Sequence, residues 1–279
     1  MLYVCYLIVA LAQAQDIDYN YITTNKAPIF ITSTTGLGYS QHLDIGVSPL
    51  SYRGLMGKQS LCFSIDIKKV RLQAEVEGFI CQSATMTHGS YPNGESQYYK
   101  QYKSLGGGGT TKASCLVRVK DINYDKMHFF VGGSSSLCFD LRHTPDFGNA
   151  SLGYSIWQSI NFDFLYEYDF TFLFQRNKGY QTHWPFKAIA GVTIPIVSGF
   201  IRPDYAYVAH ATANEVTLDY FITGFTGFNT TLGLAYNLNN GNRIQLHHEC
   251  IFNTTHNSGH HRFDGYSSSL NLSIFLKIN

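Results

Sequence analysis

Apolar and polar residues alternate along much of the chain after residue 40, in runs of about ten positions. In residues 59–68, Leu61, Phe63 and Ile65 lie at alternate positions, and serine, cysteine, aspartate and lysine lie between them. A period of two residues is typical of a β-strand with one apolar and one polar face, because successive side chains of a strand point to opposite sides. The pattern therefore predicts a strand here.

The same alternation recurs as far as the C-terminus. Its longest run is residues 159–175, with an aromatic face that begins at Ile160 and a polar face that includes Asp163. The sequence Asn-Asn-Gly-Asn at residues 239–242 predicts a tight hairpin turn, since Asn and Gly tolerate positive φ. The pattern predicts about ten to twelve strands, in or near residues 39–47, 59–68, 72–80, 115–119, 128–142, 151–159, 159–175, 186–196, 216–225, 232–238, 243–252 and 269–279.

A soluble β-sandwich also alternates, so other features must separate it from a membrane barrel. Here the apolar face is aromatic or aliphatic almost throughout, and the polar face carries charges of both signs. The runs are also nearer the roughly ten residues that cross a bilayer than the roughly six of an average strand. A sheet in lipid must close, because an open edge would leave backbone groups unsatisfied. We predict an all-β fold, a single antiparallel transmembrane β-barrel of about 10 to 12 strands.

The predicted connections differ in length. Two are short, at residues 69–71 and 239–242, and the long polar ones are residues 83–112, 144–150, 176–185, 203–214 and 253–267. Outer-membrane barrels have short periplasmic turns and longer extracellular loops. We therefore expect the long connections to be extracellular. The glycine run at residues 106–109 lacks the spacing of a nucleotide-binding loop and is interpreted as a flexible loop tip.

The N-terminus resembles an export signal. Residues 2–11 are apolar and are followed by Ala12-Gln13-Ala14, the small-residue pattern of a cleavage site. No basic residue precedes the apolar run, since Lys26 is the first, and a buried N-terminal strand is the alternative. We predict a signal peptide at residues 1–14, an N-terminal segment at residues 15–38 and an outer-membrane barrel at residues 39–279.

Composition agrees with a wall that faces lipid. Charged residues make up 14% of the 279 residues, against an average of about 25%, while 15% are aromatic. The mean hydropathy of −0.09 leaves no room for several apolar helices of about 20 residues. A net charge of +1 supplies no field that would attract nucleic acid. The expected partners are outer-membrane lipid and the barrel-assembly machinery, with no nucleic acid.

Two short segments carry a family resemblance, SPLSYRG at residues 48–54 and IPI at residues 194–196 followed by FIRPDY at residues 200–205. They resemble a family of Gram-negative outer-membrane barrels described only as a domain of unknown function. The resemblance implies a barrel fold and a bacterial outer-membrane location, and it transfers no functional residues. Such barrels commonly end in an aromatic residue that the assembly machinery recognises, whereas this chain ends Lys277-Ile278-Asn279.

Charges on the polar faces are the candidates for lining the barrel interior. A barrel of this size is narrow inside, so opposite charges can pair across it. Two interpretations stay open, a selective pore for small solutes and a structural network of ion pairs. The candidates are Asp66, Glu75, Glu77, Arg118, Lys120, Asp140, Arg142, Asp163, Glu167, Asp169, Arg243 and Glu249, with Lys68, Lys187, Asp219 and Lys277 as further members.

Other chemistry is weakly indicated. The histidines near residues 247–261 lack a recognisable ligand spacing, so no metal and no cofactor are expected. A lipid hydrolase would need a serine with a base in reach, and the candidates are His88 with Ser90 and His256 with Ser258. Five cysteines remain after signal removal, an odd number that cannot pair completely. Cys115 and Cys250 fall on the apolar face, and the other three fall on the polar face.

The sequence thus favours an outer-membrane barrel without evident catalytic chemistry, acting as a narrow solute pore or as a surface or structural protein. The alternatives are an outer-membrane lipid hydrolase and a soluble secreted β-sandwich binding module.

A barrel predicts heat-modifiable migration on a denaturing gel. Membrane-extracted protein should migrate differently before and after boiling, because a closed hydrogen-bonded barrel resists detergent until it is heated. A protein that is soluble without detergent and migrates identically in both lanes would support the β-sandwich instead.

Overall fold

The computed structural model describes residues 27–44, 48–90, 97–119, 126–145, 152–176, 180–203, 216–221, 225–255 and 263–278. Within these ranges, no helix has the length and apolar character needed to cross a membrane. The strands are β1 (Ile29–Asp44), β2 (Ser48–Ile67), β3 (Val70–Ser90), β4 (Gln97–Arg118), β5 (Met127–His143), β6 (Leu152–Arg176), β7 (Tyr180–Pro203), β8 (Val216–Phe221), β9 (Phe225–Asn237), β10 (Arg243–Thr255) and β11 (Phe263–Lys277).

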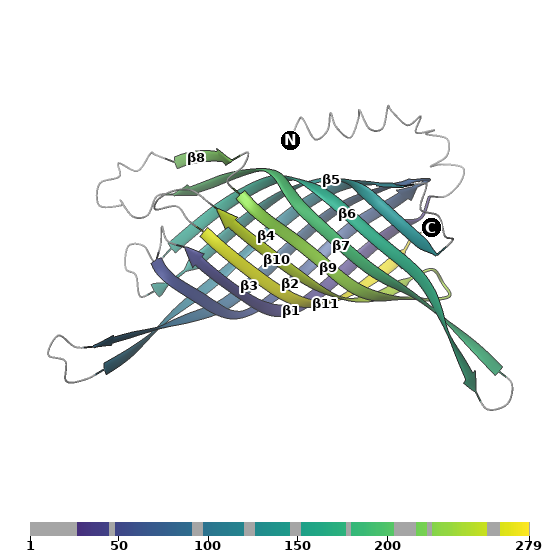
Figure 1. Cartoon of the computed structure of the whole chain (residues 1–279), viewed down its shortest axis with the longest axis horizontal. Helices are drawn as coiled ribbons and strands as arrows, with labels where there is room; N and C mark the ends of the chain where they lie inside the picture. Colours follow the sequence, from purple (N-terminus) through teal and green to yellow (C-terminus); the bar gives the residue numbers. More distant parts are fainter. Residues whose placement is uncertain are drawn as a thin grey trace.

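The strands form one antiparallel sheet that closes on itself (Figure 1). Neighbours along the chain pair with each other from β1 to β7 and from β9 to β11, and β7 also pairs with β9. The first strand pairs with the last, β1 with β11, so that no barrel strand lacks a partner on either side. Ten strands make up the barrel, and β8 adds to the edge of β7. The predicted all-β antiparallel barrel of 10 to 12 strands is confirmed.

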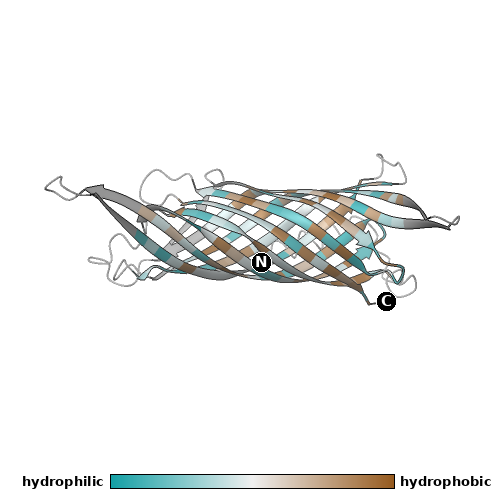
Figure 2. Cartoon of the chain, turned by 90° about the horizontal axis from the view of Figure 1, so that it is seen from below, coloured by the Kyte–Doolittle hydropathy of each residue, from teal (hydrophilic) through white to brown (hydrophobic). Residues whose placement is uncertain are grey.

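The two faces of the wall have the polarity that the alternation predicts. Leu55 on the outer face is 77% exposed, whereas Asn271 on the inner face is completely buried. Apolar positions, in brown, recur along the strands of the barrel wall in Figure 2. A soluble protein buries its apolar side chains, and this barrel presents them outward. The exterior is therefore suited to an apolar surrounding.

Aromatic side chains cluster on the outer face near one rim of the barrel. Phe170 of β6 stacks on Phe186 of β7 with ring centroids 5.8 Å apart, and Trp184 lies 5.9 Å from Tyr236 of β9. Transmembrane barrels carry such aromatic residues at the two interfaces between lipid and water. The cluster matches that position.

The short turns are close to prediction. The turn at residues 239–242 is confirmed, with Gly241 at φ 84° and the Leu238 amide donating to the Asn242 carbonyl over 2.8 Å. The turn after β2 consists of Lys68 and Lys69, one residue earlier than predicted at residues 69–71, because Ile67 already pairs with Val70. Lys68 occupies the left-handed region at φ 51°.

Three strand assignments need correction. β1 begins at Ile29, so it includes part of residues 15–38, which the sequence assigned to an N-terminal segment. Residues 151–159 and 159–175 belong to one strand, β6, because the alternation continues through both. Residues 216–225 divide between β8 and the start of β9, and β8 pairs with β7 from Ser198 to Pro203, beyond the part that β9 covers.

Two long connections were also predicted incorrectly. Most of residues 83–112 lie in β3 and β4, which form a projecting hairpin in Figure 1, so the glycine run at residues 106–109 is part of a strand and not a loop tip. The strands β3, β5, β7 and β10 end at one rim of the barrel, whereas β6 ends at the other. The connection near residues 176–185 therefore lies at the rim of the short turns, where the β6–β7 hairpin projects (Figure 1).

Pro195 lies at an irregularity between β6 and β7. Asn161 pairs with Pro195 and Ile160 pairs with Val197, which leaves Ile196 as an extra residue. Proline cannot donate a ladder hydrogen bond, so in a central strand it is tolerated at a bulge of this kind. This bulge explains how one of the resemblance segments fits inside the barrel wall.

Gly108 sits where neighbouring strands approach too closely for a side chain. A Cβ atom there would lie 2.0 Å from the Phe139 carbonyl oxygen and 2.8 Å from the ring of Phe79. By contrast, the nearest atom to a Cβ at Gly78, on the adjacent strand β3, is 3.9 Å away. Glycine at such positions lets a barrel wall bend.

Replacing Gly108 by alanine should destabilise the barrel by about 1 to 3 kcal/mol, since the wall must shift to admit the methyl group. Urea titration of the protein refolded in lipid vesicles measures the effect. Gly78→Ala is the matched control and should cost well under 1 kcal/mol by the same reasoning. Equal losses in the two variants would show that the close approach at Gly108 has no energetic importance.

Candidate functional site

Ion pairs join strands that are not neighbours in the sheet, so they must pass through the barrel interior. Lys58 of β2 contacts Glu249 of β10, although β1 and β11 lie between these strands. The Lys58 ammonium is also 3.2 Å from Glu77 of β3, and the Lys58 side chain is only 5% exposed. Asn229 of β9 donates to the second oxygen of Glu249 over 2.7 Å. We call Lys58, Glu77 and Glu249 the Lys58 cluster.

A second contact crosses the interior beside it. The Lys112 ammonium of β4 lies 3.2 Å from Asp163 of β6 and 3.4 Å from the hydroxyl of Thr193 on β7. The Thr193 hydroxyl donates to the same Asp163 oxygen over 2.5 Å. These three residues, the Lys112 cluster, connect β4, β6 and β7.

A third group lies near the short turns. Arg71 of β3 donates to both oxygens of Asp66 over 2.8 and 3.2 Å and to Glu167 of β6 over 2.7 Å. Lys187 of β7 lies 2.7 Å from the other oxygen of Glu167, whose side chain is 3% exposed. These four residues form the Arg71 cluster. It continues to Asp169, which lies 3.5 Å from the Lys187 ammonium and 2.9 Å from His128.

Such pairing is a condition for placing charges in this interior. Removing an ion from water costs several kcal/mol, and a partner in good geometry offsets that cost. Glu167 has a cation on each oxygen, and Glu249 has a cation on one oxygen and an amide on the other. The pairs therefore hold the strands together across the interior and also occupy its cross-section.

The described part of the wall encloses a smaller and a larger cavity. The smaller one, about 170 Å³, is near the short turns and is lined by Lys68, Lys69, Arg71 and Glu167 among others. The larger one, about 320 Å³, extends toward the opposite rim, where β1 and β5 end and β11 begins. Lys58, Glu77 and Lys112 contribute to the wall of the larger cavity, so the Lys58 and Lys112 clusters lie along one side of it.

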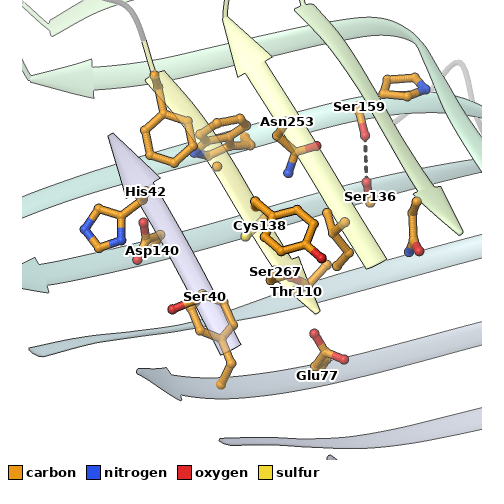
Figure 3. A pocket seen from close by; sticks show the side chains of 18 of the residues that line it. Ser40, His42, Glu77, Thr110, Ser136, Cys138, Asp140, Ser159, Asn253 and Ser267 are labelled. Atoms are coloured by element: carbon orange, nitrogen blue, oxygen red, sulfur yellow. Dashed lines mark hydrogen bonds between the residues drawn. The ribbon is translucent and has the colours of Figure 1, made fainter. Parts of the chain in front are cut away.

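The wall of the larger cavity combines neutral polar groups with aromatic rings (Figure 3). The hydroxyls of Ser136 and Ser159 share a hydrogen bond of 2.7 Å. Trp157 of β6 contacts Phe263 of β11 edge to face across the interior, with ring centroids 4.9 Å apart. The Arg142 guanidinium lies 5.2 Å from the Phe263 ring.

The predicted interior residues are found in several places. Asp66, Arg118 and Glu167 line the smaller cavity, and Glu77, Asp140 and Arg142 line the larger one. Asp163, Asp169 and Glu249 take part in the ion pairs above, and Glu75 lies opposite Lys112 in the β3–β4 ladder. The Arg243 guanidinium lies 5.1 Å from the Phe275 ring and donates a hydrogen bond to Asn237. Lys120 lies outside the described residues.

The sequence reasoning missed three cations that the structure places at the centre of the clusters. Lys58 precedes the predicted strand at residues 59–68, Arg71 was assigned to a turn, and Lys112 was assigned to a loop. All three lie on the inner face of strands that are longer than predicted. Extending the alternation by a few residues at each strand end would have found them.

The described residues do not bring the other candidate groups together in a metal or catalytic site. Within the described residues, no three His, Cys, Asp or Glu side chains are grouped as metal ligands. Ser90 ends β3, and residues 256–258, with His256 and Ser258, lie outside the described residues. The five cysteines are unpaired with one another, and Cys81 and Cys138 line the larger cavity.

No family model matches the chain, and no curated protein sequence matches it. Solved structures that it is similar to include the outer-membrane protease OmpT of Escherichia coli, with 7% identity, coverage of 90% of this chain and 96% of OmpT, and a TM-score of 0.49. Others are Neisserial surface protein A (7%, 90% and 97%, 0.32) and the toluene transporter TodX of Pseudomonas putida (8%, 93% and 91%, 0.33). These similarities concern the barrel fold.

Glu167 allows a direct test of the ion pairs. Glu167→Gln should lower the free energy of unfolding by about 3 kcal/mol, because Arg71 and Lys187 each lose an ionised partner in a buried position. Urea titration in lipid vesicles gives the value.

Glu75→Gln is the matched control. Glu75 also lies on the inner face of the wall, but the described residues show no ion pair within 4.0 Å for it. Its replacement should therefore have a much smaller effect. If both variants lose the same stability, the Arg71 cluster contributes nothing specific.

Proposed function

We propose that this protein is a bacterial outer-membrane β-barrel that acts as a narrow pore for small solutes, without catalytic chemistry of its own. The observation that carries the proposal is the Lys58 cluster. It joins β2, β3 and β10 across the interior, and its Lys58 and Glu77 also border the larger cavity. The pore would be limited by these side chains and not by the backbone wall.

The proposed location rests on the polarity of the wall. Apolar side chains cover the outer face, and the aromatic cluster around Phe186 and Trp184 lies near one rim. The closed ladder gives every barrel strand a hydrogen-bonded neighbour on both sides, as a hydrocarbon surrounding requires. A Gram-negative outer membrane, reached after export with the predicted signal at residues 1–14 and with the barrel-assembly machinery, is the setting that these features fit.

The pore proposal follows from the placement of polar groups and space. Charged side chains line both cavities, with the Arg71 cluster in the wall of the smaller one and Lys58 and Glu77 in the wall of the larger one. Lysine and glutamate have flexible side chains, so their ion pairs are constrictions that a small solute or water can pass by rearrangement. We expect low conductance, since a barrel of this strand number is narrow.

The surface or structural role is the second possibility within the same fold. It predicts a sealed interior in which the ion pairs serve only stability. A conductance measurement separates the two. The lipid-hydrolase alternative is tested separately, by assaying phospholipid hydrolysis in the native protein and in Ser90→Ala and Ser258→Ala.

The double variant Lys58→Ser with Glu249→Ser tests the pore. It removes both partners of the crossing ion pair together, so neither Lys58 nor Glu249 is left unpaired, and only Glu77, whose side chain is 21% exposed, loses its contact with Lys58. In planar lipid bilayers the native protein should show small discrete current steps, and the variant should show steps several-fold larger.

The control is Arg53→Ser with Lys126→Ser, which removes two charges at exposed positions and should leave the step size unchanged. If the native protein and the Lys58 and Glu249 variant are both folded and neither conducts, the pore proposal is wrong and the barrel is structural.

A further inference from the structure

We infer that the larger cavity is a binding site for a small uncharged molecule with an aromatic ring. The inference goes beyond the proposed pore, because a barrel can conduct without holding a ligand and can hold a ligand without conducting. The inference depends on the charges, the aromatic rings and the volume of this cavity.

The charges in the cavity wall are already matched to one another. Lys58 and Glu77 belong to the Lys58 cluster, Lys112 contacts Asp163, and the Arg142 guanidinium lies 2.9 Å from Asp140. An ionic ligand would have to break one of these pairs or add an unpaired charge in a buried site, and both are unfavourable. A neutral ligand meets neither cost, so the wall selects against charge.

Apolar side chains point inward at this level, although the inner face of the barrel is mostly polar. The cavity is lined by Met56 of β2, Phe79 of β3, Trp157 of β6, Ile251 of β10 and Phe263 of β11. Rings prefer to meet other rings edge to face or offset, as Trp157 and Phe263 already do. The apolar part of a ligand would therefore be an aromatic ring that extends this arrangement.

The space beside Phe79 depends on glycine. Gly108 pairs with Phe79 on β3 and with Asp140 on β5, and a side chain at this position would meet the ring of Phe79. Glycine at this position gives the Phe79 ring room to lie against β4, and Phe79 borders the cavity from there. Neutral donors and acceptors, such as Thr110, Ser136 and Asn253, also border this space and suit one small polar substituent on the ring (Figure 3).

The volume sets the size of the ligand. Ligand sites usually have volumes of about 300 to 1,000 Å³ and mostly apolar walls with a few polar groups. An engineered apolar cavity of about 150 Å³ is enough for benzene. At about 320 Å³, this cavity is large enough for a compound of one or two rings.

The two tryptophans of the chain make the inference testable. Trp157 lines the cavity, whereas Trp184 lies on the outer face and is 42% exposed. Trp184→Phe leaves Trp157 as the only tryptophan and hence as a reporter. Nitrobenzene, a neutral ring that quenches tryptophan fluorescence, should quench Trp157 saturably in the detergent-solubilised protein. The matched ion 4-nitrobenzoate should bind at least roughly tenfold more weakly, a difference of about 1.4 kcal/mol.

Two variants show where the nitrobenzene binds. Trp157→Phe keeps only Trp184 and should show linear, unsaturable quenching from probe dissolved in the micelle. In the Trp184→Phe background, Ser136→Phe fills the cavity and should abolish saturation while the heat-modifiable migration persists. If that variant does not fold, displacement of nitrobenzene by toluene, which lacks the quenching group, serves the same purpose.

Linear quenching of Trp157 would overturn the inference, and so would equal affinity for nitrobenzene and 4-nitrobenzoate. Saturable binding of glucose with no binding of nitrobenzene would also overturn it, since the site would then be one for hydroxylated ligands. Bilayer conductance is measured on the same preparations, so failure of the ligand site is distinguishable from failure of the pore.

Discussion

Closure of the backbone ladder is the constraint on which the rest of this structure depends. The pairing of β1 with β11 and of β6 with β7 gives each barrel strand a partner on both sides. This allows the wall to present apolar side chains outward without exposing unpaired amides to an apolar surrounding. The low charge and high aromatic content of the chain are consequences of that wall, because charged side chains are unfavourable on the face that meets an apolar surrounding.

Closure also creates the narrow interior in which the remaining charges must be accommodated. With ten strands, side chains of strands that are not neighbours reach one another across the interior, as Lys58 and Glu249 do. Each buried charge then needs a partner within the same small space. For the proposed pore this links stability to permeability, since the contacts that brace the wall would also be those that limit the passage.

The larger cavity shows how the same wall leaves room for a ligand. Gly108 and residues with small side chains, such as Ser136, occupy little of the interior, whereas the large rings of Trp157 and Phe263 extend into it from other strands. The cavity results from this uneven distribution of side-chain size around the barrel. Its neutral character results from the ion pairs, because the charged side chains along its wall already contact partners of opposite charge.

The period of two in the sequence was enough to predict the fold class and the opposite polarity of the two faces of the wall, because alternation follows from strand geometry alone. It assigned Glu77, Glu167 and Glu249 to the polar face, and these three residues take part in the interior ion pairs. It could not predict their partners, since Lys58 and Glu249 are 191 positions apart. Which residues meet across the interior depends on the number of strands, their tilt and their stagger. Only the tertiary structure decides those quantities, and with them the ion pairs and the cavities.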